Sequence, residues 1–90
     1  MKKHLALKIC GRVQGVFFRV EAKKEADVLG LAGFTNNESD GTLVIEAEGE
    51  EKALKDFLSW CKKGPAGAYV THVEMQYGKP KGFTEFEIKE

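Results

Sequence analysis

Apolar side chains alternate with polar or small ones over residues 5–10, 43–48 and 72–77. A repeat of two residues is typical of a β-strand that buries one face, so each stretch predicts a strand. Shorter strands are predicted at residues 34–37, just before the Ser39-Asp40-Gly41 turn, and at residues 86–88, which Phe86 and Ile88 mark.

Two other stretches repeat their apolar side chains every three or four residues, which predicts two helices that bury one side. The first begins near Phe18 and ends at Gly30, a residue suited to the left-handed conformation that closes many helices. The second begins near Glu50 and ends at residues 62–65, where two lysines, a glycine and a proline follow one another. The apolar stripes are Phe18, Ala22, Ala26 and Leu29 in the first helix and Ala53, Leu54, Phe57, Leu58 and Cys61 in the second.

The order of the predicted elements is βαββαβ, followed by the short fifth strand, and an Asp40-Gly41 turn joins the two middle strands. Strands with one polar face predict a mainly antiparallel sheet, with both helices covering its other face. This arrangement is the α+β, ferredoxin-like split βαβ sandwich. With 90 residues, no internal repeat and no linker, we expect a single domain over residues 1–90.

The charge balance argues against several kinds of partner. Fourteen Lys and Arg offset fourteen Asp and Glu, so the chain lacks the excess positive charge on which nucleic-acid binding usually depends. No apolar run approaches the length of a membrane span, and Lys8 interrupts the first apolar stretch too early for a secretory signal. We therefore expect a cytoplasmic monomer that binds neither nucleic acid nor membranes.

Residues that bind metals or form redox pairs are sparse. Cys10 and Cys61 lie far apart and form no C-x-x-C motif, and His4 and His72 belong to no cluster with the spacing of metal ligands. We expect no metal and no other cofactor. Both cysteines are interpreted as small, buried or half-buried hydrophobic residues.

The segment from Gly11 to Arg19 joins the first predicted strand to the first helix and holds both arginines of the chain, Arg12 and Arg19. Gly11 and Gly15 allow positive φ angles, so successive N–H groups can point into one concavity beside the start of the helix. Arg19 stands in the first turn of that helix, where the helix dipole opposes a cation unless an anion binds. The segment therefore predicts an anion site, and phosphate fits because a guanidinium contacts two of its oxygens at once.

Other phosphate chemistries do not match these residues. There is no G-x-x-x-x-G-K-[ST] motif, which argues against a nucleoside triphosphate loop. A cysteine phosphatase would need its arginine closer to Cys10 than Arg19 stands, and no base lies beside Cys10 to form the thiolate. Only two serines are present and no histidine lies near the segment, so a Ser-His-Asp triad is not indicated. The predicted site binds an anion and has no evident nucleophile.

The same segment reads Gly11-x-Val13-Gln14-Gly15-Val16-x-Phe18-Arg19, and this pattern resembles the signature of the acylphosphatases, small enzymes that hydrolyse the carboxyl–phosphate bond of acyl phosphates. The resemblance continues through Gly30-Leu31-x-Gly33-Phe34-Thr35-Asn36-Asn37-x-x-Asp40-Gly41-Thr42 and later short matches, so it covers nearly the whole chain. The first pattern is highly specific, the second is moderately so, and the remainder mostly reflects the fold.

The resemblance implies roles for the matching residues. Arg19 corresponds to the phosphate-binding arginine of the family, and Asn37 corresponds to the asparagine that positions the attacking water. A substrate oxygen is expected to accept the proton of that water, and inorganic phosphate is expected as product and inhibitor. The family's cradle of backbone amides falls on Arg12, Val13, Gln14, Gly15, Val16, Phe17, Phe18 and Arg19.

Three positions depart from the family pattern. Phe34 stands where tryptophan is usual, Asn36 where a basic residue is common, and Glu38 where threonine is usual. Strand alternation places Asn36 and Glu38 on the side opposite Asn37. The lost cation and the gained anion are still expected to weaken the attraction for phosphate at low salt.

Two binding functions compete with catalysis. Ferredoxin-like sheets bind RNA through aromatic side chains on exposed central strands, but residues 6–10 and 42–48 expose acidic side chains and no aromatic one. We therefore do not expect RNA binding. The remaining alternative is a non-catalytic module that binds phosphate or carbamoyl phosphate, like the acylphosphatase-like domains of larger hydrogenase-maturation proteins.

Overall fold

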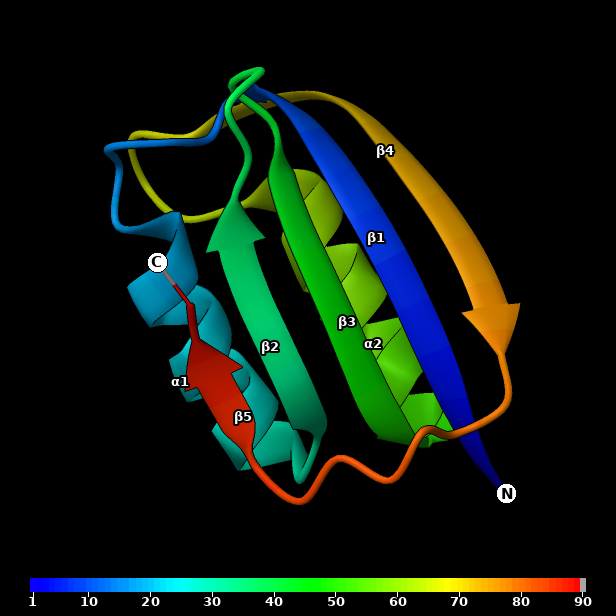
Figure 1. Ribbon diagram of the computed structural model, residues 1–90. Helices are drawn as coiled ribbons and strands as arrows, with labels where there is room; N and C mark the ends of the chain where they lie inside the picture. The colour runs from blue at the N-terminus through cyan, green and yellow to red at the C-terminus, as the bar shows by residue number, and fades with distance from the viewer. Residues whose placement is uncertain (90) are drawn as a thin grey trace.

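The computed structural model describes residues 1–89. Within these residues, strands and helices follow one another in the predicted order (Figure 1). Their bounds are β1 (Lys2–Arg12), α1 (Phe18–Leu29), β2 (Ala32–Asn37), β3 (Leu43–Glu50), α2 (Glu51–Lys63), β4 (Tyr69–Gly78) and β5 (Phe86–Ile88).

The strands form one sheet in the order β4-β1-β3-β2-β5. β1 pairs antiparallel with both β3 and β4, and β2 pairs antiparallel with β3. β5 joins the outer edge of β2 in the parallel direction, so the sheet is mixed rather than wholly antiparallel. Both helices cover one face of the sheet and leave the other face open (Figure 1). The predicted ferredoxin-like α+β sandwich is confirmed.

The core lies between the sheet and the helices, where the predicted apolar positions meet. Opposed residues of β1 and β3 face it, such as Leu5 with Ala47 and Leu7 with Ile45, and all four are buried. Burying an apolar side chain of this size contributes about 1.5–3 kcal/mol, so the stripes dock both helices on this face. The helices contribute Phe18, Ala22 and Ala26 from α1 and Leu54, Phe57 and Cys61 from α2.

β1 and β4 are longer than the apolar alternation predicts. The sequence predicts a loop from Gly11, but Gly11 and Arg12 still pair with Val70 and Tyr69 after a register shift that follows Cys10. Gly11 has φ 124°, and a Cβ at this position would collide with the carbonyl oxygen of Tyr69. The glycine therefore marks a bulge in the paired strands, and the loop before α1 is confined to residues 13–17, which we call the cradle loop.

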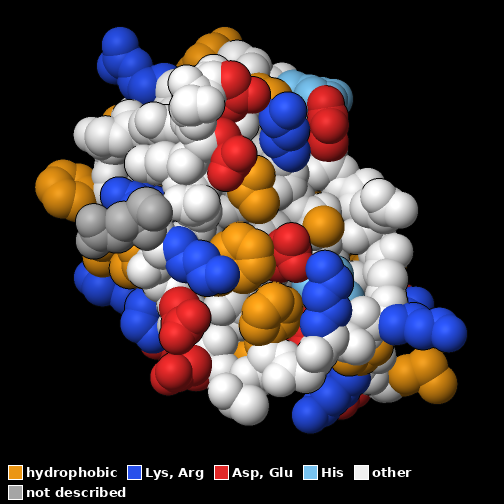
Figure 2. Space-filling model, viewed as in Figure 1, with side chains coloured by type: hydrophobic (Ala, Val, Ile, Leu, Met, Phe, Trp, Pro, Cys, Tyr) orange, Lys and Arg blue, Asp and Glu red, His pale blue; other side chains and the backbone are white. Residues whose placement is uncertain are grey.

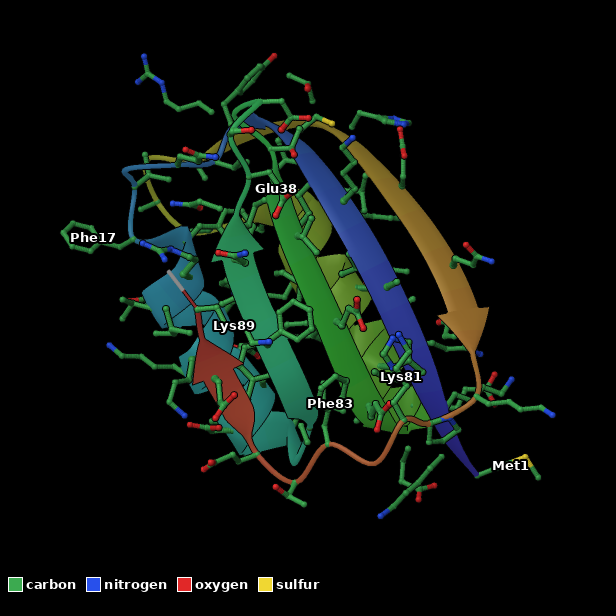
Figure 3. The ribbon with its side chains drawn as sticks, viewed as in Figure 1. Met1, Phe17, Glu38, Lys81, Phe83 and Lys89 are labelled. Carbon is green, nitrogen blue, oxygen red and sulfur yellow. The ribbon has the colours of Figure 1, made fainter. Side chains whose placement is uncertain are left out.

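The open face carries aromatic side chains beyond the two central strands. Phe34 of β2 meets Phe83 of the β4–β5 connection edge-on, with ring centroids 5.8 Å apart. The Nζ of Lys89 lies 4.2 Å from the centroid of the Phe34 ring (Figure 3). Charged side chains of both signs surround the apolar ones on this face (Figure 2). These rings pack against other side chains, and the expectation of no RNA binding stays a prediction.

Candidate active site

A pocket of ≈ 450 Å³ opens at the N-terminal end of α1. Its walls come from the cradle loop, the first turn of α1, the end of β2 and the end of β5. Figure 1 shows β5 beside α1, so a segment from late in the sequence meets the cradle loop and the first turn of α1 here. The lining residues are Val13, Gly15, Phe17, Phe18, Arg19, Val20, Asn37 and Ile88. The pocket thus joins Arg19 and Asn37, which the sequence predicts to act together.

The backbone of the cradle loop leaves its N–H groups available to a ligand. Gly15 and Phe17 adopt left-handed conformations, with φ of 74° and 62°, so the chain turns sharply before α1 begins. The backbone N–H groups from Gln14 to Arg19 donate to no backbone or side-chain acceptor among residues 1–89. N–H groups of this kind at the positive end of a helix favour a bound anion.

Arg19 is half-buried and held by the end of the chain. Its Nη1 donates to the carbonyl oxygen of Lys89 at 2.7 Å, and the N–H of Lys89 donates to the carbonyl oxygen of Thr35 at 2.8 Å. The guanidinium makes no other hydrogen bond or ion pair with the part of the chain that the structure describes. One of its five donors is therefore fixed on the backbone, and the others remain for a ligand.

Asn37 is the last residue of β2 and lies on the helix side of the sheet, whereas Asn36 lies on the open side. The Oδ1 of Asn37 is buried and has no hydrogen-bond partner among residues 1–89. Asn36 shares this feature but does not line the pocket. A buried acceptor without a partner costs about 1–3 kcal/mol, so a donor from a water or ligand is expected at Asn37.

The side chain of Gln14 holds the cradle loop against the β2–β3 turn, a role that the sequence does not predict. Its Nε2 donates to the carbonyl oxygens of Glu38 and Thr42, at 2.8 and 2.9 Å. These two carbonyls flank the β2–β3 turn, so the bonds tie the cradle loop to the segment that follows Asn37. The sequence offers no local signal for these bonds, because Glu38 and Thr42 lie 24 and 28 residues away from Gln14.

The structure places some of the predicted cradle residues at the pocket and others away from it. Arg12 is exposed and its backbone belongs to β1, so it lies outside the cradle loop. Two lining residues were not predicted: Val20, which lies off the buried stripe of α1, and Ile88, whose place depends on the pairing of β5 with β2. The predicted residues that line the pocket are Val13, Gly15, Phe17, Phe18, Arg19 and Asn37, and those that do not are Arg12, Gln14 and Val16.

Groups that could support other chemistry lie elsewhere. Cys61 is fully buried, and this burial together with the nearby charge of Glu25 raises the pKa of its thiol. Cys10 is half-buried, and neither cysteine lines the pocket, so both behave as the small hydrophobic residues that were expected. Across residues 1–89, no group of three or more His, Cys, Asp or Glu could hold a metal ion. In the same residues, neither helix is long and apolar enough to span a membrane.

The fold and the pocket define a small α+β sandwich with a pocket at the start of its first helix. The sequence model of the family named Acylphosphatase matches residues 5–88. A protein named Acylphosphatase from Nocardioides sp. is 40% identical over 89 residues, which cover 99% of this chain and 90% of that protein. The crystal structure of acylphosphatase from Bacillus subtilis is 36% identical with a TM-score of 0.95, covering 98% of this chain and 99% of that chain. The chain belongs to the acylphosphatase family, hydrolases that act on acyl phosphates.

A region of a larger protein is also similar. Full-length HypF, crystallised in a phosphate- and nucleotide-bound form, matches with 28% identity and a TM-score of 0.88. The match covers 100% of this chain and 12% of the HypF chain. The fold therefore also occurs as one part of a much longer protein.

Proposed function

We propose that the pocket hydrolyses acyl phosphates by holding the phosphoryl group on the N–H groups of the cradle loop and on Arg19, while Asn37 positions the attacking water. The observation that carries the proposal is the meeting of three features at one pocket. These are a run of N–H groups without protein partners, an arginine with one fixed edge, and a buried amide oxygen without a partner. No metal and no cofactor take part in this mechanism.

Charge supports the binding of phosphate here. Arg19 is the one charged residue among the lining residues that the structure describes, so no carboxylate among them opposes an anion. Hydrogen bonds from N–H groups to an ionised phosphate are about twice as strong as those between neutral groups. Glu38, a departure from the family pattern, has an exposed side chain and does not line the pocket. Its carboxylate is thus expected to act on the phosphate only at a distance, through solvent.

The amide of Asn37 suits a water molecule. Its Oδ1 accepts a hydrogen bond from the water, which turns a lone pair of the water toward the phosphorus atom. An amide cannot remove the proton, so Asn37 positions the nucleophile and does not act as a base. A bound water removes the free-energy cost of burying this oxygen without a hydrogen-bond partner.

The reaction itself needs little covalent help from the protein. The water oxygen attacks phosphorus, and the bond between phosphorus and the acyl oxygen breaks. The acyl oxygen keeps the electron pair and leaves as a carboxylate, while the proton of the water moves to a phosphoryl oxygen. Because the leaving group is already stabilised and the transition state is loose, positioning and charge stabilisation supply most of the catalysis.

Replacement of Arg19 tests the phosphate contact. Because the guanidinium would touch phosphate before and during the reaction, Arg19→Ala is expected to raise KM for acetyl phosphate and to lower kcat by roughly 10²–10³. Arg19→Lys is expected to fail substantially as well, since an ammonium cannot make the two-pronged contact. Lys24→Ala, which removes an exposed cation of the same helix, is the matched control. Normal kinetics in folded Arg19→Ala would contradict the proposal.

Replacement of Asn37 tests the water position. Asn37→Ala is expected to lower kcat by roughly 10²–10³ and to leave KM and inhibition by phosphate nearly unchanged, because the amide acts on the nucleophile alone. Asn36→Ala, which removes the adjacent amide on the opposite face, is expected to keep its kcat. If folded Asn37→Ala retained near-normal kcat, the water would have to be held elsewhere.

The same assay distinguishes the enzyme from a binding module. An enzyme releases inorganic phosphate from acetyl phosphate over many turnovers, whereas a non-catalytic module binds phosphate or carbamoyl phosphate without turnover. Binding in calorimetry with no release of phosphate would favour the module. The nearly complete mutual coverage between this chain and the acylphosphatase from Nocardioides sp. supports the enzyme.

A further inference from the structure

We propose that Phe17, Val20 and Ile88 form a subsite for the acyl group, which selects acyl phosphates with a bulky apolar acyl group, above all an aromatic one. This inference rests on the proposed function, since it assigns the part of the pocket that the phosphate does not fill. The three residues come from three segments: the cradle loop, the first turn of α1 and β5. We call them the apolar rim.

The three apolar side chains of the rim are exposed to solvent. Phe17 is 77% exposed, Val20 is 42% exposed and Ile88 is 37% exposed. Single exposed apolar side chains are normal, but several around one pocket mark a surface that binds something apolar. Each fully buried methylene adds about fourfold to affinity, so a ligand that covers part of this rim gains measurably.

Phe17 is held outward by its backbone. It is the one non-glycine residue with positive φ among those described, and it precedes α1 in the left-handed conformation. That conformation costs about 1–2 kcal/mol for a residue with a Cβ. Figure 3 shows the ring standing out from the body of the molecule beside the start of α1. An aromatic ring fixed in this place offers a flat wall to a planar acyl group.

The size and charge of the pocket narrow the class of acyl group. Its volume of ≈ 450 Å³ falls within the range of about 300–1,000 Å³ that holds ligands larger than a phosphate ion. Arg19, the one cation among the lining residues that the structure describes, is taken by the phosphoryl group. An acyl group with a second carboxylate would therefore meet no second cation among these lining residues, while a benzoyl or branched aliphatic group would meet the apolar rim.

The test compares benzoyl phosphate with acetyl phosphate, whose acyl group is too small to cover the rim. The double variant Val20→Ala with Ile88→Ala is expected to lower kcat/KM for benzoyl phosphate about tenfold, mainly through KM. For acetyl phosphate the expected loss is at most threefold. Because each substrate is compared with itself in wild type and variant, the difference between the leaving groups cancels. Val28→Ala, which trims an exposed valine elsewhere on α1, is the matched control and is expected to change neither value.

Equal losses for the two substrates would overturn the subsite, because they would report general damage near Arg19. No change for either substrate would overturn it as well. Binding of benzoylphosphonate and acetylphosphonate, which cannot be hydrolysed, is measured in parallel by calorimetry. If neither acyl phosphate is hydrolysed but benzoylphosphonate binds at least tenfold tighter and the double variant removes this preference, the subsite stands and the proposed reaction fails. If hydrolysis occurs and the phosphonates bind equally, the subsite fails and the reaction stands.

Discussion

At the scale of single residues, Arg19 carries its charge where the fold is least suited to a cation. The N–H groups of the first turn of α1 and the preceding loop already make this end of the helix positive. The carbonyl oxygen of Lys89 offsets part of this repulsion, since it accepts a hydrogen bond from one edge of the guanidinium. A bound dianion would remove the remainder. The positive end of α1 and the guanidinium of Arg19 repel each other, and both would attract a bound anion.

Gln14 provides the first prediction at this scale. Gln14→Ala removes two hydrogen bonds to the backbone of the β2–β3 turn, each of which contributes about 0.5–1.5 kcal/mol. We expect the free energy of unfolding to fall by about 1–2 kcal/mol and the affinity for phosphate to fall as well, because the cradle loop loses its support. Urea unfolding and calorimetry with phosphate measure the two effects.

Gln76→Ala is the matched control for this variant, because Gln76 is an exposed glutamine on the outer strand β4. It is expected to change neither the free energy of unfolding nor the affinity for phosphate. If Gln14→Ala behaved like Gln76→Ala in both measurements, the link between the loop and the turn would have no energetic weight.

At the scale of elements, Glu48 of β3 holds the β4–β5 connection on the open face. Its Oε1 accepts hydrogen bonds from the N–H groups of Gly82 and Phe83, at 3.0 and 3.1 Å, and its Oε2 accepts one from the N–H of Lys81. The Nδ1 of His4 lies 2.7 Å from the same Oε2. Figure 3 shows Lys81 and Phe83 in front of the open face of the sheet. The connection leads directly into β5, so Glu48 helps to deliver Ile88 and Lys89 to the pocket.

The carboxylate of Glu48 makes the stability depend on pH. Burial acts to raise its pKa, but the backbone N–H groups of the connection and the contact with His4 together hold the pKa below its usual range. A carboxyl whose pKa is lower in the folded than in the unfolded state stabilises the fold at high pH. That contribution is complete well above the ordinary glutamate pKa of about 4.3 and is lost as pH falls through the lower folded value.

We expect Glu48→Gln to lower the free energy of unfolding at pH 7 by about 2–3 kcal/mol, because bonds to a charged acceptor are replaced by weaker ones. The difference in free energy of unfolding between wild type and variant, which we call the gap, is expected to close as pH falls below about 4. Asp40 and Glu50 also have lowered pKa values, but their effect is the same in both proteins and cancels in the difference. Urea unfolding from pH 7 to low pH measures the gap. Glu87→Gln serves as an exposed control, and a gap that stays constant with pH would contradict this account of Glu48.

Elements with strong local patterns could be predicted from the sequence, and those that depend on a partner strand could not. The helices were predicted closely, because the apolar stripes of Phe18 and Phe57 and the glycines that follow are local signals. The extension of β1 to Arg12 was missed, because it depends on pairing with β4 across a bulge at Gly11. Apolar alternation does not report such pairing, and a glycine there suggests a loop and a bulge equally.

At the scale of the whole molecule, the pocket combines a part that is continuous in sequence with a part that comes from much later in the chain. The cradle loop and Arg19 are continuous in sequence, so their meeting at one pocket could be predicted from local signals. Ile88 and the carbonyl oxygen of Lys89 reach the pocket only because β5 adds in parallel to β2. The sequence offers no local signal for that pairing. The contribution of the cradle loop and Arg19 to the pocket was therefore predictable, while the places of Ile88 and of the carbonyl oxygen that supports Arg19 were not.

The last prediction concerns phosphate and metal together. Inorganic phosphate is expected to inhibit hydrolysis of acetyl phosphate competitively and to stabilise the fold, because it fills the site of the phosphoryl group without being consumed. At ten times its Kd, a ligand of the folded state adds about 1.4 kcal/mol, which raises the Tm of a domain of this size by roughly 5–10 °C. Both effects are expected to persist after exhaustive treatment with EDTA, because in the proposed mechanism N–H groups and Arg19 stabilise the negative charge of the phosphate. Arg19→Ala is the control and is expected to lose most of the shift in Tm. If EDTA abolished hydrolysis and added Zn²⁺ or Mg²⁺ restored it, the proposed mechanism without metal would be wrong.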